Sequence, residues 1–112
     1  MKHTVIVESS DGTQSGFMLE YCEWLGWDAP APQEIYIPLH EVDGKFIGEI
    51  DLPDDRDWRF KCTIATNVKV AIALDPPRPI AWPYKAKWPV VKEGPAGGSN
   101  ALVIYFTTKV QP

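Results

Sequence analysis

The stretch DWRFKCTIATNVKVAIALD, residues 57–75, decides the fold. Apolar and polar side chains alternate on both sides of a short polar segment, as in two half-buried β-strands. A three-residue loop at 65–67 would pair Ile64 with Val68, and Asn67 tolerates the left-handed conformation that such a loop needs at its end. We therefore expect a hairpin at the centre of the core, with these apolar positions on one face: Trp58, Phe60, Cys62, Ile64, Val68, Val70, Ile72 and Leu74.

A second hairpin is expected in EIYIPLHEVDGKFIGEIDLP, residues 34–53. Asp43-Gly44 is typical of a type I′ turn, which needs positive φ at both central residues. Such a turn pairs Ile35 with Leu52, Ile37 with Ile50 and Leu39 with Gly48 on one side, and Tyr36 with Asp51, Pro38 with Glu49 and Val42 with Lys45 on the other. Because proline cannot donate a ladder hydrogen bond, Pro38 indicates an edge or an irregularity.

The N-terminal segment permits two interpretations. Residues 3–8 and 16–21 can pair around Asp11-Gly12, with Ile6 opposite Phe17. The run GFMLEYCEWLG, residues 16–26, also has the apolar spacing of a helix, with Gly26 as its C-cap. The Asp-Gly turn favours a strand through Tyr21, followed by a possible short helical turn near 20–26.

The C-terminal third predicts two more strands. Residues 84–92, YKAKWPVVK, alternate like a half-buried strand, and residues 101–110, ALVIYFTTKV, are apolar on both faces and predict an internal strand. With the segments above, the chain predicts one all-β domain over residues 1–112. Its expected architecture is an antiparallel β-sandwich or small barrel of about eight strands.

Residues 75–89, DPPRPIAWPYKAKWP, contain five prolines and two tryptophans. Their proline spacing favours a stiff polyproline conformation, so we interpret this segment as a rigid crossover between sheets, with Trp82 and Trp88 filling the core edge. The alternative is that it is presented to a partner, because Pro76 and Pro79 form a PxxP pair beside Arg78.

The chain has five tryptophans, which is many for 112 residues. Trp24 and Trp27 precede a loop at 28–32 that is rich in proline and alanine, so we expect them to be exposed. Exposed tryptophans stack on sugar rings or lie at a lipid surface. The candidate ligand-binding or partner-binding residues are Trp24, Trp27, Arg78, Trp82 and Tyr84.

Four aspartates, Asp51, Asp54, Asp55 and Asp57, are weak candidates for a calcium site. Their spacing lacks the closing glutamate of an EF-hand loop, and aspartate is common in turns because it hydrogen-bonds to nearby backbone. We therefore expect neither a metal nor another cofactor.

The residues for catalysis are few. His3, His40, Cys22 and Cys62 are the histidines and cysteines of the chain, and no CxxC, HExxH or GxSxG motif occurs. Cys22 is the one arguable nucleophile, since Cys62 is predicted to lie in the core. We expect a domain that is not an enzyme.

The net charge of −4 and a pI near 5.0 argue against nucleic acid as a partner. No apolar run is long enough for a signal peptide or a membrane span, which predicts a cytoplasmic protein or one exported without an N-terminal signal. The expected function is binding to another protein or self-association as an assembly, accessory or inhibitor-like domain. The alternative is a module that binds carbohydrate or a lipid surface through exposed tryptophans.

Overall fold

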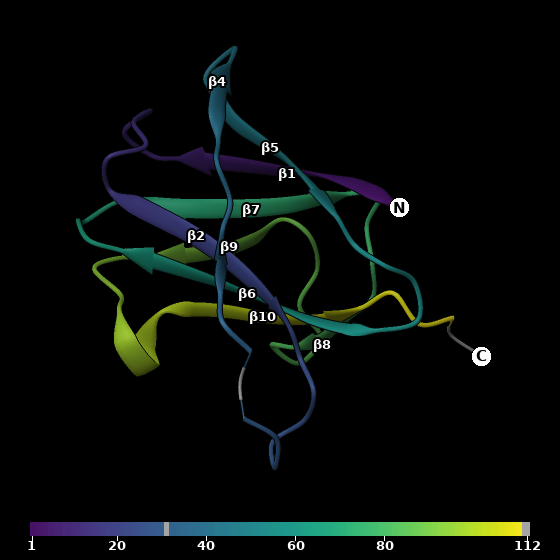
Figure 1. The fold of residues 1–112 in the computed structure, drawn as a ribbon. Coiled ribbons are helices and arrows are strands. Elements are labelled where there is room, and N and C mark those ends of the chain that lie inside the picture. Colours follow the sequence, from purple (N-terminus) through teal and green to yellow (C-terminus); the bar gives the residue numbers. More distant parts are fainter. Residues whose placement is uncertain (31, 111–112) are drawn as a thin grey trace.

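The computed structural model describes residues 1–30 and 32–110. Ala31, in the predicted loop at 28–32, and residues 111–112, at the end of the predicted domain, lie outside the described residues. Two antiparallel five-stranded sheets pack face to face (Figure 1), which confirms the all-β class and selects the sandwich over the barrel. The strands are β1 (Lys2–Ser9), β2 (Phe17–Glu23), β3 (Ile35–Tyr36), β4 (His40–Val42), β5 (Lys45–Asp51), β6 (Asp57–Ile64), β7 (Lys69–Asp75), β8 (Ile80–Trp82), β9 (Val90–Glu93) and β10 (Leu102–Thr107).

Most strands that follow each other in the sequence lie in different sheets. The first sheet has the order β4-β5-β1-β7-β9, and the second has the order β3-β2-β6-β10-β8. Among the described strands, only the β2–β3 and β4–β5 connections stay within one sheet. Every other connection carries the chain across the core to the opposite layer.

The prediction of a hairpin in residues 57–75 is wrong, although its burial pattern is right. β6 lies between β2 and β10 in the second sheet, and β7 lies between β1 and β9 in the first. Residues 65–68 therefore connect the two sheets. Ile64 and Val68, at the two ends of this connection, are both buried in the core. A strand pair that arches over the core shows the same alternation as a hairpin, because in both cases one face of each strand is apolar.

The turn at the centre of residues 34–53 is confirmed. Asp43 and Gly44 have φ values of 52° and 81°, and Val42 pairs with Lys45 and His40 with Ile47.

For the residues that precede Leu39, the predicted register is wrong. Ile35 pairs with Tyr21 of β2 instead of Leu52, and the N–H of Ile37 donates to the Leu19 carbonyl at 3.0 Å. Gly48 provides the physical reason: a Cβ there would lie 2.7 Å from the Pro38 carbonyl oxygen. The missing side chain lets residues 37–39 cross over β5 on their way between the sheets.

The N-terminal pairing is also wrong, because β1 lies in the first sheet and β2 in the second. The strand through Tyr21 is confirmed and continues to Glu23. Residues 20–26 contain no helical turn, and among the described residues the helical element is a single 3-10 turn at Gly98–Asn100.

The C-terminal predictions are partly confirmed. β10 is internal in its sheet, between β6 and β8, as expected, but residues 84–89 form no strand and β9 begins at Val90. The segment after β7 crosses to the opposite sheet, as expected, but the crossover is shorter than predicted because residues 80–82 form β8. Trp88 packs on the core, with its ring 5.8 Å from that of Phe106, whereas Trp82 is 56% exposed and does not fill the core edge.

The core lies between the two sheets. Val5, Ile72, Phe60 and Ile104 are completely buried and represent inner strands of both layers. Burial of each such side chain contributes about 1.5–3 kcal/mol to stability, so this core holds the two sheets together. No helix in the described residues is long and apolar enough to cross a membrane.

Candidate functional site

A row of four side chains crosses the outer face of the second sheet. Cys22 on β2 pairs with Arg59 on β6, Arg59 pairs with Tyr105 on β10, and Tyr105 pairs with Trp82 on β8. Side chains directly opposite each other on neighbouring strands lie on the same face of a sheet. The register therefore fixes an outward row of one buried thiol, one cation and two aromatic rings.

The chain that leaves β2 adds two tryptophans to this row. The N–H of Trp24 donates to the Asp57 carbonyl at 2.8 Å, which ties the start of the loop to β6. Gly26 follows with φ 109°, a backbone conformation that residues other than glycine rarely adopt, and the chain reverses direction there. The Trp24 ring then meets those of Trp27 and Tyr105, each with centroids 4.9 Å away and an edge-to-face orientation.

Arg59 and Glu34 hold the loop from beneath. Nη2 of Arg59 donates to Oε1 of Glu34 at 2.8 Å, and both side chains are less than one-fifth exposed. The same guanidinium lies over the Trp24 ring, 5.4 Å from its centroid, and Lys61 lies 3.8 Å from the second oxygen of Glu34. A partly buried ion pair that also makes a cation–π contact restricts the loop on the sheet.

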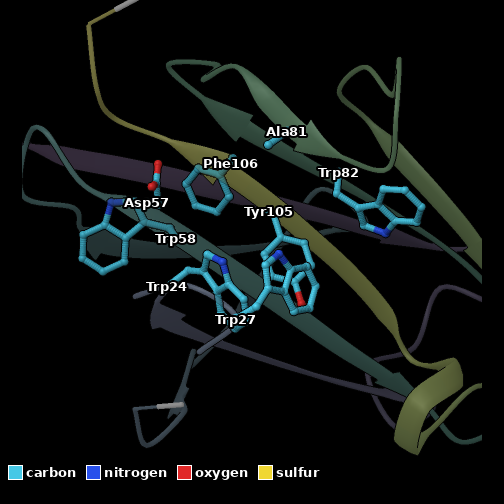
Figure 2. A pocket seen from close by; sticks show the side chains of 8 residues that line it. All are labelled: Trp24, Trp27, Asp57, Trp58, Ala81, Trp82, Tyr105 and Phe106. Carbon is cyan, nitrogen blue, oxygen red and sulfur yellow. The ribbon is translucent and has the colours of Figure 1, made fainter. Parts of the chain in front are cut away.

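The rings surround a pocket of about 370 Å³ on the outer face of the second sheet. In Figure 2, Tyr105 lies between Trp24 on one side and Trp82 on the other. Trp27 is 81% exposed and Trp82 56% exposed, so their faces are open to solvent. The lining residues are Trp24, Trp27, Asp57, Trp58, Ala81, Trp82, Tyr105 and Phe106. We call this space the aromatic pocket.

The structure brings together three of the five residues that the sequence indicated. Trp24, Trp27 and Trp82 line the aromatic pocket, although they come from distant parts of the chain. Tyr84 lies outside this lining and is 78% exposed, with the Lys85 ammonium 5.5 Å from its ring centroid.

Arg78 also lies outside the pocket lining and makes structural contacts. Its Nε donates to Nε2 of the buried His3 at 2.8 Å, and its carbonyl accepts a 2.8 Å hydrogen bond from the Trp88 indole. Nδ1 of His3 donates to the Met1 carbonyl at 3.0 Å, so the ring is neutral when both bonds are made. Burial is the main cause of a pKa of His3 below the ordinary histidine value.

Two residues of the site were missed in the sequence. Tyr105 faces outward on β10, a strand whose two faces are both apolar, so the pattern marks it as internal without indicating a site. Arg59 reads as an ordinary charged residue on the outer face of β6. Their importance depends on the register between strands, which the sequence does not reveal.

The candidate metal-binding aspartates have different local surroundings. Asp51 forms an ion pair with the amino terminus at 3.0 Å, and Asp57 forms one with Lys109 at 3.1 Å. Asp55 occupies a left-handed turn position with φ 63°. In residues 1–30 and 32–110, no group of three or more histidine, cysteine or acidic side chains is placed to hold a metal.

The two thiols are buried. Burial raises the pKa of Cys62 to about 12, and burial also raises the pKa of Cys22 above its ordinary value. A thiol with a raised pKa forms little of the thiolate that attacks electrophiles. The outer face of the second sheet is therefore equipped for contact with flat apolar groups and for hydrogen bonding at Asp57, and its thiol is poorly suited to nucleophilic chemistry.

Comparison of the chain with protein-family models, curated proteins and solved structures found no match.

Proposed function

We propose that this protein is a non-catalytic carbohydrate-binding module and that the aromatic pocket is its ligand site. The observation that carries the proposal is the grouping of Trp24, Trp27, Trp82 and Tyr105 around one open hollow. Exposed aromatic surface is unfavourable in water, and when it is concave and gathered in one place it generally marks a binding site.

A sugar ring suits this hollow because it has an apolar face of C–H groups and a polar rim of hydroxyls. The ring faces of Trp27 and Trp82 are open to stack on the C–H face. The Asp57 carboxylate, at the margin of the pocket, can accept hydrogen bonds from hydroxyls. A lipid surface is the competing ligand, but a concave pocket matches a single ring better than a flat membrane.

The test is a titration of intrinsic tryptophan fluorescence with glucose, mannose, N-acetylglucosamine and their oligomers. We expect a saturable shift with at least one sugar series, and we expect Trp27→Ala to abolish it. Tyr84→Ala is the matched control, because it removes an exposed aromatic ring outside the pocket lining. Absence of a shift with every sugar, or a shift only with phosphatidylcholine vesicles, would contradict the proposal.

Self-association through a sheet edge is a second candidate, favoured by a different observation. β8 pairs with β10 only at Tyr105 and Phe106, so among the described strands none lies beside Leu102–Ile104 on that side. An uncovered ladder edge is a template for a strand from another copy. Light scattering over a wide concentration range tests this idea, and a strict monomer at every concentration would contradict it.

A further inference from the structure

A second hollow adjoins the aromatic pocket. It has a volume of about 330 Å³ and is lined by Glu23, Trp24, Leu25, Gly26, Asp55, Arg56, Asp57 and Lys109. Two of these residues, Trp24 and Asp57, also line the aromatic pocket. The two hollows therefore border each other at Trp24 and Asp57, and we call them together the groove. We call the second part the charged hollow.

The charges in this hollow come in pairs. Arg56 lies 3.6 Å from Glu23, and Lys109 lies 3.1 Å from Asp57. The Arg56 side chain is about half exposed, so its remaining N–H groups can reach a ligand. Because Asp55 adds a further carboxylate, strong donors and strong acceptors line the same space.

This arrangement discriminates between ligand classes. The carboxylates of Glu23, Asp55 and Asp57 disfavour an anion, and the cations of Arg56 and Lys109 disfavour a positively charged ligand. A hydrocarbon chain would remove these charged groups from water without replacing their hydrogen bonds. A hydroxyl group both donates and accepts, so neighbouring hydroxyls can satisfy a carboxylate and a cation together.

We propose that the groove binds a neutral oligosaccharide of at least two sugar rings. One ring stacks in the aromatic pocket against Trp27 and Trp82, and the next extends past Trp24 into the charged hollow. There its hydroxyls bridge the Arg56–Glu23 pair and donate hydrogen bonds to the carboxylate of Asp57. This inference rests on the proposed carbohydrate-binding function and adds the length and charge of the ligand.

The experiment compares a monosaccharide with its disaccharide by calorimetry, using glucose with cellobiose, mannose with mannobiose, and N-acetylglucosamine with chitobiose. We expect the disaccharide of the recognised series to bind about tenfold more tightly than the monosaccharide. The double variant Glu23→Ala/Arg56→Ala should lose most of this gain, while it keeps the monosaccharide affinity. The acidic disaccharide digalacturonate should bind more weakly than the recognised neutral one.

The matched control is Glu8→Ala/Lys45→Ala. It removes another exposed ion pair, at 3.8 Å, from strands of the first sheet, and it also leaves the net charge unchanged. We expect it to preserve the disaccharide affinity. Equal binding of monosaccharide and disaccharide, or an unchanged gain in Glu23→Ala/Arg56→Ala, would overturn the two-ring inference while Trp27-dependent binding still upheld the proposed function. If no sugar binds at all, the proposed function fails and the inference fails with it.

Discussion

The guanidinium of Arg59 lies over the ring of Trp24, 5.4 Å from its centroid, and connects a sheet to the loop that builds the aromatic pocket. The same group is hydrogen-bonded to Glu34 at the far end of that loop. One side chain of β6 therefore holds both ends of the segment that carries Trp27. The shape of the pocket therefore depends on this contact as well as on the tryptophans.

We expect Arg59→Met to loosen the loop and weaken ligand binding without unfolding the sandwich. Removal of the guanidinium leaves Glu34 partly buried without its main partner, at a cost of about 1–3 kcal/mol. Near-ultraviolet circular dichroism should lose intensity from the contacts among Trp24, Trp27 and Tyr105, while the far-ultraviolet spectrum is retained. Lys61→Met is the control, since Lys61 is 3.8 Å from Glu34 and has no ring contact with Trp24. Equal spectra for Arg59→Met and the wild type would contradict this role.

Gly48→Ala should destabilise the protein. The added Cβ would lie 2.7 Å from the Pro38 carbonyl oxygen, and the backbone that crosses there has to move. Overpacking of this kind typically costs about 1–3 kcal/mol. Urea unfolding measures the change. Gly97→Ala is the control because Gly97 has an extended backbone and its nearest contact would be 3.6 Å away, so its stability should change by less than about 0.5 kcal/mol. Equal destabilisation of both variants would contradict the packing argument.

The free energy of unfolding should decrease as the pH falls below the ordinary histidine value of about 6.5. Burial lowers the pKa of His3 in the folded protein, so the unfolded chain takes up the proton first and acid favours unfolding. Well above about pH 6.5, His3 is neutral in both the folded and the unfolded protein, and it makes its full contribution to the free energy of unfolding. A protonated His3 would also lose its acceptor for Arg78 and face the positive charges of Arg78 and the amino terminus, while Asp54 opposes this effect.

Thermal unfolding at pH 7.5 and pH 5.5 tests the role of His3. His3→Gln should show a smaller loss of stability between these two values, because glutamine does not titrate. His40→Gln, which replaces the other histidine of the chain at an exposed position on β4, is the matched control. An unchanged pH dependence in His3→Gln would refute the assignment.

Both thiols should resist alkylation by iodoacetamide in the native protein. Cys62 is completely buried with a pKa of about 12, and Cys22 is 2% exposed with a raised pKa. Mass spectrometry should find two modified cysteines only after denaturation. Rapid native labelling of Cys22 would revive the interpretation of that residue as a nucleophile.

The sequence was a good guide to burial and a poor guide to pairing. Every apolar position predicted in residues 57–75 is buried, from Trp58 to Leu74. The partner strands were wrong because alternation records only which face of a strand is apolar. Whether residues 65–67 return the chain along the same sheet or carry it to the opposite one depends on what the other strands offer. The Asp43-Gly44 turn was predictable because its backbone conformation is a local property.

The site shows the same difference between what local sequence predicts and what depends on strand pairing. The exposure of Trp27 was predicted correctly from the loop that follows it, but Trp24 is only partly exposed because Trp27, Tyr105 and Arg59 pack against its ring. Tyr105 and Arg59 were not, because they join the site only through the register of β2, β6, β10 and β8. Arg78, which the sequence indicated as a partner-binding candidate, instead donates a hydrogen bond to His3 near the amino terminus. Long-range contacts of this kind leave no signal in local composition.

The position of β10 between β6 and β8 has a consequence for biosynthesis. The second sheet cannot close until this late strand has left the ribosome, and until then the apolar inner side of β6 has no complete wall around it. A nascent chain that has released β6 but not β10 therefore exposes apolar surface and an unpaired strand edge, which are features that favour aggregation.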